Sequence, residues 1–306
     1  MNNLREFIFF CNFAALLIFI AICMRVALLQ YPIAWADKEA NLRLAEERIA
    51  ALAGKADVAV LPEMFATGFC TDHPELAETM DGDIIRRLQA AADQSGVAIV
   101  SSFICKPAIG QRLVNRGFMI TPHSVYPNRE ELECGSNLPS HQQGRDEDRL
   151  FVQDKRHLYA HGGEDLFFQP AQERHIFEYK GVKILLLVCY DLRFPVWARN
   201  RSGYDYDLIL VVANWPDIRI QYWDALIAAR ATENQCYIAA VNCVGNDGMG
   251  LHYNGHSVAY DTRLQPIAHF KDNEEGTKIA EFDIAKLHHF REVLPLWQDV
   301  DNFELQ

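Results

Sequence analysis

Residues 185–195 read LLLVCYDLRFP, an apolar run that stops at Cys189 and continues into charged residues and a proline. An unbroken apolar run of this length is typical of a strand that is buried on both faces. A structural cysteine is expected inside such a run, whereas Cys189 stands at its end. There its side chain can face solvent and a substrate, so the pattern indicates a functional thiol at a strand terminus.

On both sides of this run, strand and helix patterns alternate along the chain from Met24 onward. Several strands are apolar on both faces, which requires helices on one side of a sheet and a further layer on the other. The pattern therefore predicts a layered α/β domain with one core. The predicted strands are residues 26–33, 57–63, 97–104, 115–121, 181–190, 207–215, 236–244, 255–261 and 277–284, and the predicted helices are residues 37–52, 82–92 and 218–234.

Charge and cysteine content exclude several classes of protein. The 306-residue chain has 29 basic and 41 acidic residues, and its net charge of −12 argues against the basic face of a nucleic-acid-binding protein. The 8 cysteines form no CxxC pair, and neither they nor the histidines show the spacing of a metal site. We therefore predict no metal, no cofactor and no nucleic-acid partner. Cysteines beside apolar runs are typical of reduced thiols, so the predicted location is cytoplasmic.

Two segments depart from a simple enzyme domain. Residues 7–23 are apolar except for Asn12, but they are short for a membrane span and no signal-peptide cleavage site follows them. They are either a membrane anchor or lie upstream of a natural start at Met24. We favour the second interpretation because a strand follows without a linker, which makes residues 1–23 an extension and residues 24–306 the domain. Membrane association is expected only if residues 7–23 belong to the native protein.

The second segment, residues 123–149, is polar, rich in turn residues and without periodicity. Long loops of this kind are either functional lids or poorly ordered insertions. We favour an insertion into the domain.

Two further polar residues stand out beside Cys189. Glu63 ends a short apolar strand in LPEMF (61–65), and Lys155 lies in DKRHL (154–158), after the polar loop. Taken alone, Glu63 is explained as a solvated strand end or a helix cap, and Lys155 as a surface lysine. A catalytic cysteine, however, needs a base or a positive charge beside it, because a free thiol has a pKa of about 8.5.

Together, LPEMF, DKRHL and CYDLRFP resemble the glutamate, lysine and cysteine motifs of the nitrilase, or carbon–nitrogen hydrolase, superfamily. The resemblance starts at Met24 and covers essentially the rest of the chain. It includes NRGFMIT (115–121), ANWP (213–216), RATENQCYIAAVNCVGNDG (230–248) and PLWQD (295–299). Within the superfamily, the chain is most similar to the bacterial omega-amidases, whose nucleophile motif also reads CYDLRFP. The resemblance implies a four-layer α-β-β-α sandwich and a homodimer.

The resemblance also implies roles for the site residues. Cys189 matches the nucleophile on a tight turn, Glu63 the general base, and Lys155 the lysine that stabilises the oxyanion. Glu164, in GGED (162–165), matches a second glutamate that orients the first pair, although Asp165 and Glu173 are alternatives nearby. The backbone N–H of Tyr190 is the expected second donor to the oxyanion.

Arg193 follows the nucleophile by four residues and has two interpretations. It is either a structural arginine paired with Asp191 or Asp207, or a clamp for a substrate carboxylate, which guanidinium binds in a bidentate manner. We favour the clamp, because omega-amidases hydrolyse the terminal amide of short dicarboxylic acid monoamides. Trp215 is expected to form a wall of the pocket or to lie in the core.

The expected activity is therefore hydrolysis of an amide such as 2-oxoglutaramate through a cysteine thioester. Another carbon–nitrogen hydrolase activity, that of a carbamoylase, a ureidopropionase or a nitrilase, is the alternative within the superfamily. A membrane-associated acyltransferase of the same superfamily is less favoured, because one apolar stretch is far short of a membrane bundle.

Overall fold

The computed structural model describes residues 23–108, 110–123, 150–201 and 203–301. The expectations for residues 1–22 and for the segment 124–149 lie outside the described residues. Among the helices that the structure does describe, none combines the length and the apolar character needed to span a membrane.

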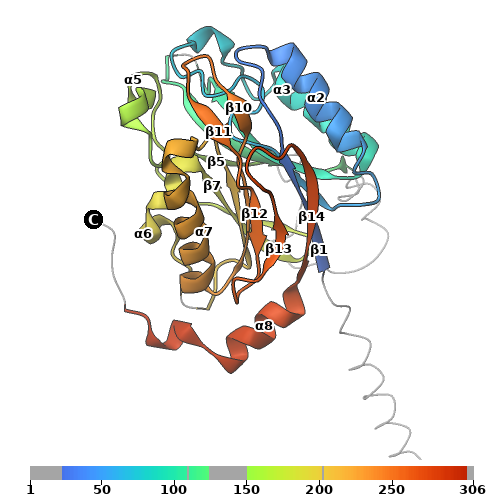
Figure 1. The fold of residues 1–306 in the computed structure, drawn as a ribbon, viewed down its shortest axis with the longest axis vertical. Helices are drawn as coiled ribbons and strands as arrows, with labels where there is room; N and C mark the ends of the chain where they lie inside the picture. Colours follow the sequence, from blue (N-terminus) through green and yellow to red (C-terminus); the bar gives the residue numbers. More distant parts are fainter. Residues whose placement is uncertain (1–22, 109, 124–149, 202, 302–306) are drawn as a thin grey trace, which may run out of the picture.

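Two six-stranded sheets form the centre of the molecule (Figure 1). In the first sheet, β1 and β2 run parallel, β2 and β3 run parallel, and the remaining pairs are antiparallel. Its strand order is β14 (Gly276–Asp283), β1 (Cys23–Gln30), β2 (Val58–Val60), β3 (Ala98–Cys105), β4 (Val114–Ile120) and β5 (Leu150–Asp154).

In the second sheet, β7, β8 and β9 run parallel at the centre and are flanked by antiparallel strands. Its order is β13 (Pro266–His269), β12 (Val258–Tyr260), β9 (Tyr237–Val241), β8 (Leu208–Val212), β7 (Val182–Val188) and β6 (Ile176–Tyr179). Parallel neighbours end at the same edge of a sheet, so the residues that follow β7 and β8 lie side by side.

Helices cover the outer faces of both sheets (Figure 1). Helices α2 (Lys38–Ala50) and α3 (Asp83–Ser95) pack on the first sheet, and α7 (Ile220–Asn234) packs on the second. Asp37 caps α2 as the sequence predicts, since its side chain accepts from the backbone N–H of Ala40. The predicted four-layer α-β-β-α sandwich is therefore confirmed.

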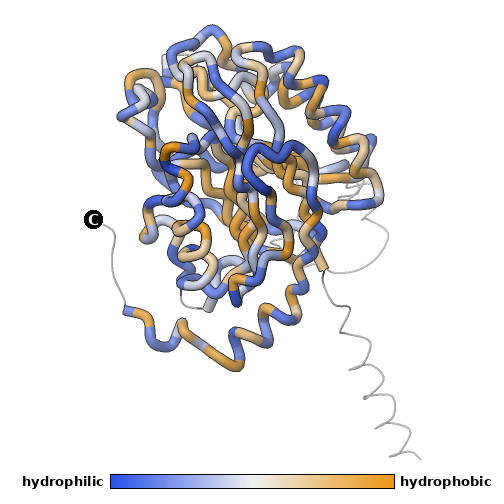
Figure 2. Tube along the Cα trace, viewed as in Figure 1, coloured by the Kyte–Doolittle hydropathy of each residue, from blue (hydrophilic) through white to orange (hydrophobic). Residues whose placement is uncertain are grey.

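Gly117 in β4 has no room for a side chain. A Cβ atom on Gly117 would lie 2.6 Å from the backbone oxygen of Gln153 in the neighbouring strand β5 and 2.9 Å from a methyl carbon of Leu186 in β7 of the other sheet. Because the contact with Gln153 involves backbone, only glycine fits at this position. An apolar core lies between the sheets, and Figure 2 shows the hydrophobic residues concentrated along the central strands.

Several elements were not predicted from the sequence. Strands β5, β6 and β13 are short, and two more short strands, β10 (Val244–Asn246) and β11 (His252–Asn254), form a separate hairpin. The last helix, α8 (Ile284–Val293), begins directly after β14. Two four-residue helices, α5 (Glu164–Phe167) and α6 (Pro195–Ala198), follow the segments that carry Lys155 and Cys189.

Candidate active site

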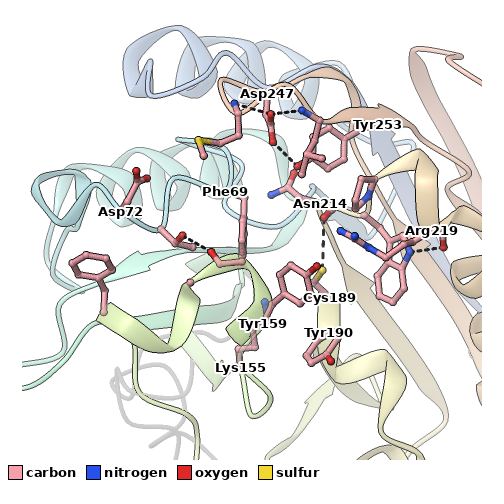
Figure 3. A pocket seen from close by; sticks show the side chains of 18 of the residues that line it. Phe69, Asp72, Lys155, Tyr159, Cys189, Tyr190, Asn214, Arg219, Asp247 and Tyr253 are labelled. Carbon is pink, nitrogen blue, oxygen red and sulfur yellow. Dashed lines mark hydrogen bonds between the residues drawn. The ribbon is translucent and has the colours of Figure 1, made fainter.

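A pocket of about 260 Å³ opens where β7 and β8 end (Figure 3). Its lining includes five of the seven residues that the sequence singles out: Lys155, Cys189, Tyr190, Arg193 and Trp215. The other two, Glu63 and Glu164, are fully buried and contact Lys155. The structure therefore brings all seven residues to one place.

Cys189 is the first residue after β7 and begins the 3₁₀ turn Cys189–Arg193. Its φ of +46° lies in the left-handed region, which is unusual for a residue with a side chain and is typical of strained functional sites. Only 8% of the residue is exposed. Cys189 is therefore less exposed to solvent than its position at the strand end suggests, and the tight turn directs it into the pocket, where a substrate can reach it.

Asp191 fixes this turn and joins it to the lysine motif. Its buried carboxylate accepts from the backbone N–H of Val188 at 3.2 Å and from that of His157 at 2.8 Å. The ring nitrogen Nδ1 of His157 lies 2.8 Å from the same carboxylate. His157 is two residues from Lys155. Asp191 therefore links the turn at Cys189 to the segment that carries Lys155.

Glu63 lies in the turn after β2 and is completely buried. Its Oε1 accepts from Nζ of Lys155 at 2.9 Å and from Nδ2 of Asn115 at 2.8 Å. Its Oε2 accepts from the backbone N–H of Asn214 at 3.0 Å. Glu63 is thus neither a solvated strand end nor a helix cap.

Lys155 is also buried, so its interpretation as a surface lysine is wrong. Its ammonium donates to Oε1 of Glu63 at 2.9 Å and lies 2.9 Å from Oε2 of Glu164. Burial acts to lower the pKa of Lys155, but the carboxylates of Glu164 and Glu63 outweigh it and hold the pKa above its usual value. The lysine therefore keeps its charge inside the protein.

Among the three acidic candidates for the second glutamate, the structure places Glu164 at the lysine. Asp165 and Glu173 are exposed, whereas Glu164 is buried and also accepts from the backbone N–H of Tyr159 at 2.6 Å. Burial, together with the charge of Glu63, raises the pKa of Glu164 despite the nearby ammonium. One lysine thus faces two carboxylates in a dry site.

Burial and the charges of Glu63 and Lys155 also act on the thiol of Cys189. Burial raises its pKa well above the usual value, and the charge of Glu63 adds to this effect, while Lys155 opposes it. The resting cysteine is therefore a thiol rather than a preformed thiolate. Chemistry at this sulfur requires a base that removes the proton as the reaction proceeds, and Glu63 is the adjacent carboxylate.

Sequence reasoning missed two asparagines. Asn115 donates to Glu63 and, at 3.1 Å, to Oε1 of Glu164, and its own backbone oxygen accepts from Lys155 N. Asn214 follows β8, and its side-chain nitrogen donates to the backbone oxygen of Glu63 at 2.8 Å. The signal was present, because NRGFMIT and ANWP both belong to the family resemblance, but neither asparagine was given a role.

The guanidinium of Arg193 lies 4.7 Å above the ring of Trp215 and 5.0 Å above that of Tyr222. It forms no ion pair with any described residue. The two suggested partners are occupied, Asp191 by His157 and Asp207 by Arg291. The structure therefore does not support a structural ion pair for Arg193.

Trp215 combines both of the positions expected for it. It lines the pocket, and its ring also packs against Trp223 in the core, with ring centroids 5.6 Å apart. Tyr190 lines the pocket as well, and as the second residue of the 3₁₀ turn its backbone N–H has no acceptor within that turn.

In the described part of the chain, no cluster of three or more His, Cys, Asp or Glu side chains is arranged to hold a metal ion.

The chain resembles known proteins over almost its whole length. The model of the carbon–nitrogen hydrolase family matches residues 25–292. The omega-amidase YafV of Escherichia coli K12 is 38% identical over 283 residues, which are 92% of this chain and 98% of that protein. The 2-oxoglutaramate amidase of Bacillus subtilis strain 168 is 30% identical over 276 residues, which are 90% of this chain and 96% of that protein.

A solved structure shows the same likeness. The protein XC1258 from Xanthomonas campestris, described as a CN-hydrolase superfamily protein with an arsenic adduct in its active site, superimposes with a TM-score of 0.81. It is 34% identical, and the match covers 93% of this chain and 99% of XC1258. The chain therefore belongs to the carbon–nitrogen hydrolase family and is a hydrolase that acts on amide C–N bonds.

Proposed function

We propose that this hydrolase is an omega-amidase, which releases ammonia from the terminal amide of short dicarboxylic acid monoamides such as 2-oxoglutaramate. The observation that carries the proposal is the convergence of Glu63 and Lys155 beside Cys189, at a small pocket that also contains Arg193, which has no ion-pair partner among the described residues. The names of the E. coli and B. subtilis relatives support the same substrate class.

The reaction begins with proton transfer from Cys189 to Glu63 as the sulfur attacks the amide carbon. Oε1 of Glu63 already accepts two hydrogen bonds, whereas Oε2 accepts only one. Oε2 is therefore the oxygen with a free lone pair for the thiol proton. Because burial raises the pKa of the thiol, the attack of the sulfur depends on a base beside it.

Negative charge then develops on the amide oxygen. The ammonium of Lys155 and the backbone N–H of Tyr190 stabilise it, each acting on the transition state more than on the substrate. Protonated Glu63 returns its proton to the leaving nitrogen, so that ammonia departs and an acyl thioester remains on Cys189. A water molecule deprotonated by the same glutamate then attacks the thioester and releases the dicarboxylic acid and the free thiol.

Arg193 gives this chemistry its substrate preference. Its planar guanidinium is held by aromatic rings and has donors available for a carboxylate at the far end of the substrate. The acidic net charge of the whole chain does not prevent this, because recognition depends on the local charges of the pocket.

The proposal is tested by measuring ammonia release from a panel of substrates with the purified enzyme. We expect kcat/KM for 2-oxoglutaramate and 2-oxosuccinamate to exceed that for carbamoyl amino acids, ureidopropionate and nitriles by at least about tenfold, which is the effect of one hydrogen bond to a charged group. A higher kcat/KM for a carbamoyl compound or a nitrile would reject the omega-amidase assignment while leaving the cysteine mechanism intact.

The same proposal includes a homodimer. Val196 on α6, Val293 at the end of α8 and Leu294 directly after it are exposed by 46%, 69% and 47%, and we propose that they contribute to the contact between the subunits. Light scattering should give twice the monomer mass, and the double substitution Val293→Lys, Leu294→Lys should shift the enzyme toward monomer. A monomeric wild-type enzyme would contradict this part of the proposal.

A further inference from the structure

The pocket contains a second arginine, Arg219, which the sequence did not single out. Arg219 precedes α7, and its guanidinium lies 5.3 Å from the centre of the Tyr159 ring. In Figure 3 its side chain extends toward the pocket on the side of Cys189 and Asn214. Like Arg193, it is partly buried.

Neither of these two arginines has an acceptor for its guanidinium. In the part of the chain that the structure describes, every arginine except three donates to, or lies within ion-pair distance of, a carboxylate or a backbone oxygen. The exceptions are Arg193, Arg219 and Arg263, and Arg263 is exposed and lies outside the pocket. The two partly buried arginines that lack an acceptor thus share one small cavity.

This arrangement is unfavourable in the empty protein. Two like charges in one pocket repel each other, and the two carboxylates of the pocket lining, Asp72 and Asp247, form an ion pair with neither of them. Contact with aromatic rings compensates for part of the cost, but it leaves the planar N–H donors of each guanidinium unused. An anion with several acceptor oxygens offsets the repulsion and accepts hydrogen bonds from the unused N–H donors.

Trp215 connects the two arginines. Its indole N–H donates to the backbone oxygen of Arg219 at 2.9 Å, while the guanidinium of Arg193 lies over its ring. Trp215 therefore contacts the guanidinium of Arg193 directly and fixes the backbone at Arg219, on the segments that follow β7 and β8. The guanidinium of Arg219 also lies over the ring of Tyr159, which lines the same pocket.

We propose that Arg219 is a second specificity-determining residue, which binds the distal carboxylate of the substrate together with Arg193. This inference rests on the proposed function and names the substrate class more narrowly. The pocket selects amides whose far end is an anion with acceptor oxygens on two sides. A carboxylate has two oxygens with about four lone-pair sites, so one bidentate arginine leaves sites for the second.

The test uses two amides that differ only at the far end. Glutaramate carries a carboxylate where pentanamide carries a methyl group. Ammonia release from both amides is measured for the wild-type enzyme, Arg219→Gln and Arg219→Lys. The control is Arg263→Gln, because Arg263 also lacks an acceptor among the described residues but lies outside the pocket. We expect Arg219→Gln to lower kcat/KM for glutaramate about 10- to 100-fold, the usual effect of losing a hydrogen bond to a charged group, and to change pentanamide much less.

Arg219→Lys should restore part of the loss, because it keeps the charge but not the fork of donors. Arg263→Gln should change neither substrate. Equal losses of glutaramate and pentanamide hydrolysis in Arg219→Gln would show that Arg219 only supports Trp215 and Tyr159, and would overturn the inference.

A binding measurement separates this inference from the proposed reaction. Calorimetric titration of glutarate into Cys189→Ala, with and without Arg219→Gln, should show an affinity loss of the same 10- to 100-fold size. Unchanged affinity for glutarate overturns the role of Arg219 even if the enzyme is an omega-amidase. If the wild-type enzyme does not prefer glutaramate to pentanamide, the proposed function itself is wrong.

Discussion

The side-chain nitrogen of Asn115 donates a 2.8 Å hydrogen bond to Oε1 of Glu63, the oxygen that also accepts from Lys155. Asn115 is fully buried, and the same nitrogen donates to Glu164 at 3.1 Å. Lysine and asparagine together therefore hold two carboxylates that would otherwise repel each other. The arrangement keeps Oε1 of Glu63 occupied and leaves Oε2 for the thiol.

Replacing this asparagine should disturb the base without removing it. We expect Asn115→Ala to lower kcat about 10- to 100-fold with little change in KM, the size expected when one hydrogen bond to a charged group is lost. An unchanged kcat, or an effect on KM alone, would show that Asn115 only fills space.

The nucleophile has the most direct test. Cys189→Ala should abolish amide hydrolysis and leave the fold intact, because the small residue fits the same turn. Cys189→Ser should be nearly as inactive, since a glutamate is too weak a base to activate a hydroxyl. Acid quench of the wild-type reaction followed by mass spectrometry should show an acyl adduct on the peptide that contains Cys189. Substantial activity in either variant, with no trapped adduct, would refute the covalent mechanism.

Lys155→Met separates binding from stabilisation of the oxyanion. Loss of one preorganised donor typically costs about 3–4 kcal/mol in the transition state, or roughly a 10²- to 10³-fold lower kcat. Substrate affinity should change only modestly. The variant also leaves Glu63 and Glu164 without their shared cation, so its melting temperature must be measured beside the kinetics. A folded variant in which only KM rises would make Lys155 a binding residue.

Most of the longer strands along the chain and the three polar motifs were predictable because each depends on a local pattern, whereas the order of the strands within each sheet was not predicted. The unbroken apolar run before Cys189 and the cap at Asp37 both appear in the structure as expected. Burial was not predictable in the same way. In the sequence alone, Lys155 has the pattern of a surface residue. Folding places it between Glu63 and Glu164, which are distant in sequence from each other.

Asn115 and Arg219 were missed for the same physical reason. A lone asparagine in a strand and a lone arginine before a helix have many ordinary roles. Only the fold shows that Asn115 reaches two carboxylates and that Arg219 lacks an acceptor in a pocket. Short strands such as β10 and β11 were missed because three residues carry too little periodicity to be recognised.

Buried thiols make the stability of the protein sensitive to alkaline pH. Burial raises the pKa of Cys105 to about 11 and that of Cys70 to about 12, and it raises the pKa of Cys189, Cys236 and Cys243 as well. Between the unfolded pKa, near 9, and these folded values, the unfolded chain has released protons that the native protein still holds. Stability is therefore complete below about pH 8.5 and falls as the pH rises.

Each such thiol lowers the free energy of unfolding by up to about 1.4 kcal/mol per pH unit in that window. Urea unfolding under reducing conditions at pH 8, 9 and 10 should give a steadily decreasing free energy. Cys105→Ser should reduce the slope of the unfolding free energy against pH by the equivalent of at most one proton, because it removes one thiol. Part of the slope should persist, because four other buried thiols remain. A free energy that stays constant from pH 8 to 10 would contradict the burial of these groups.

Arg193 tests the substrate class at the residue closest in sequence to the nucleophile. If its guanidinium clamps the distal carboxylate, Arg193→Lys keeps the charge but loses the bidentate geometry. Activity on 2-oxoglutaramate should then fall about 10- to 150-fold in kcat/KM, the range for a hydrogen bond to a charged group. A neutral amide of similar length should be affected much less, because it has no carboxylate for the arginine to bind. A structural arginine behaves differently: its loss would distort the turn at Cys189, lower the melting temperature and reduce hydrolysis of both amides alike. The ratio of the two kcat/KM values, compared between Arg193→Lys and wild type at matched stability, therefore decides between the two roles.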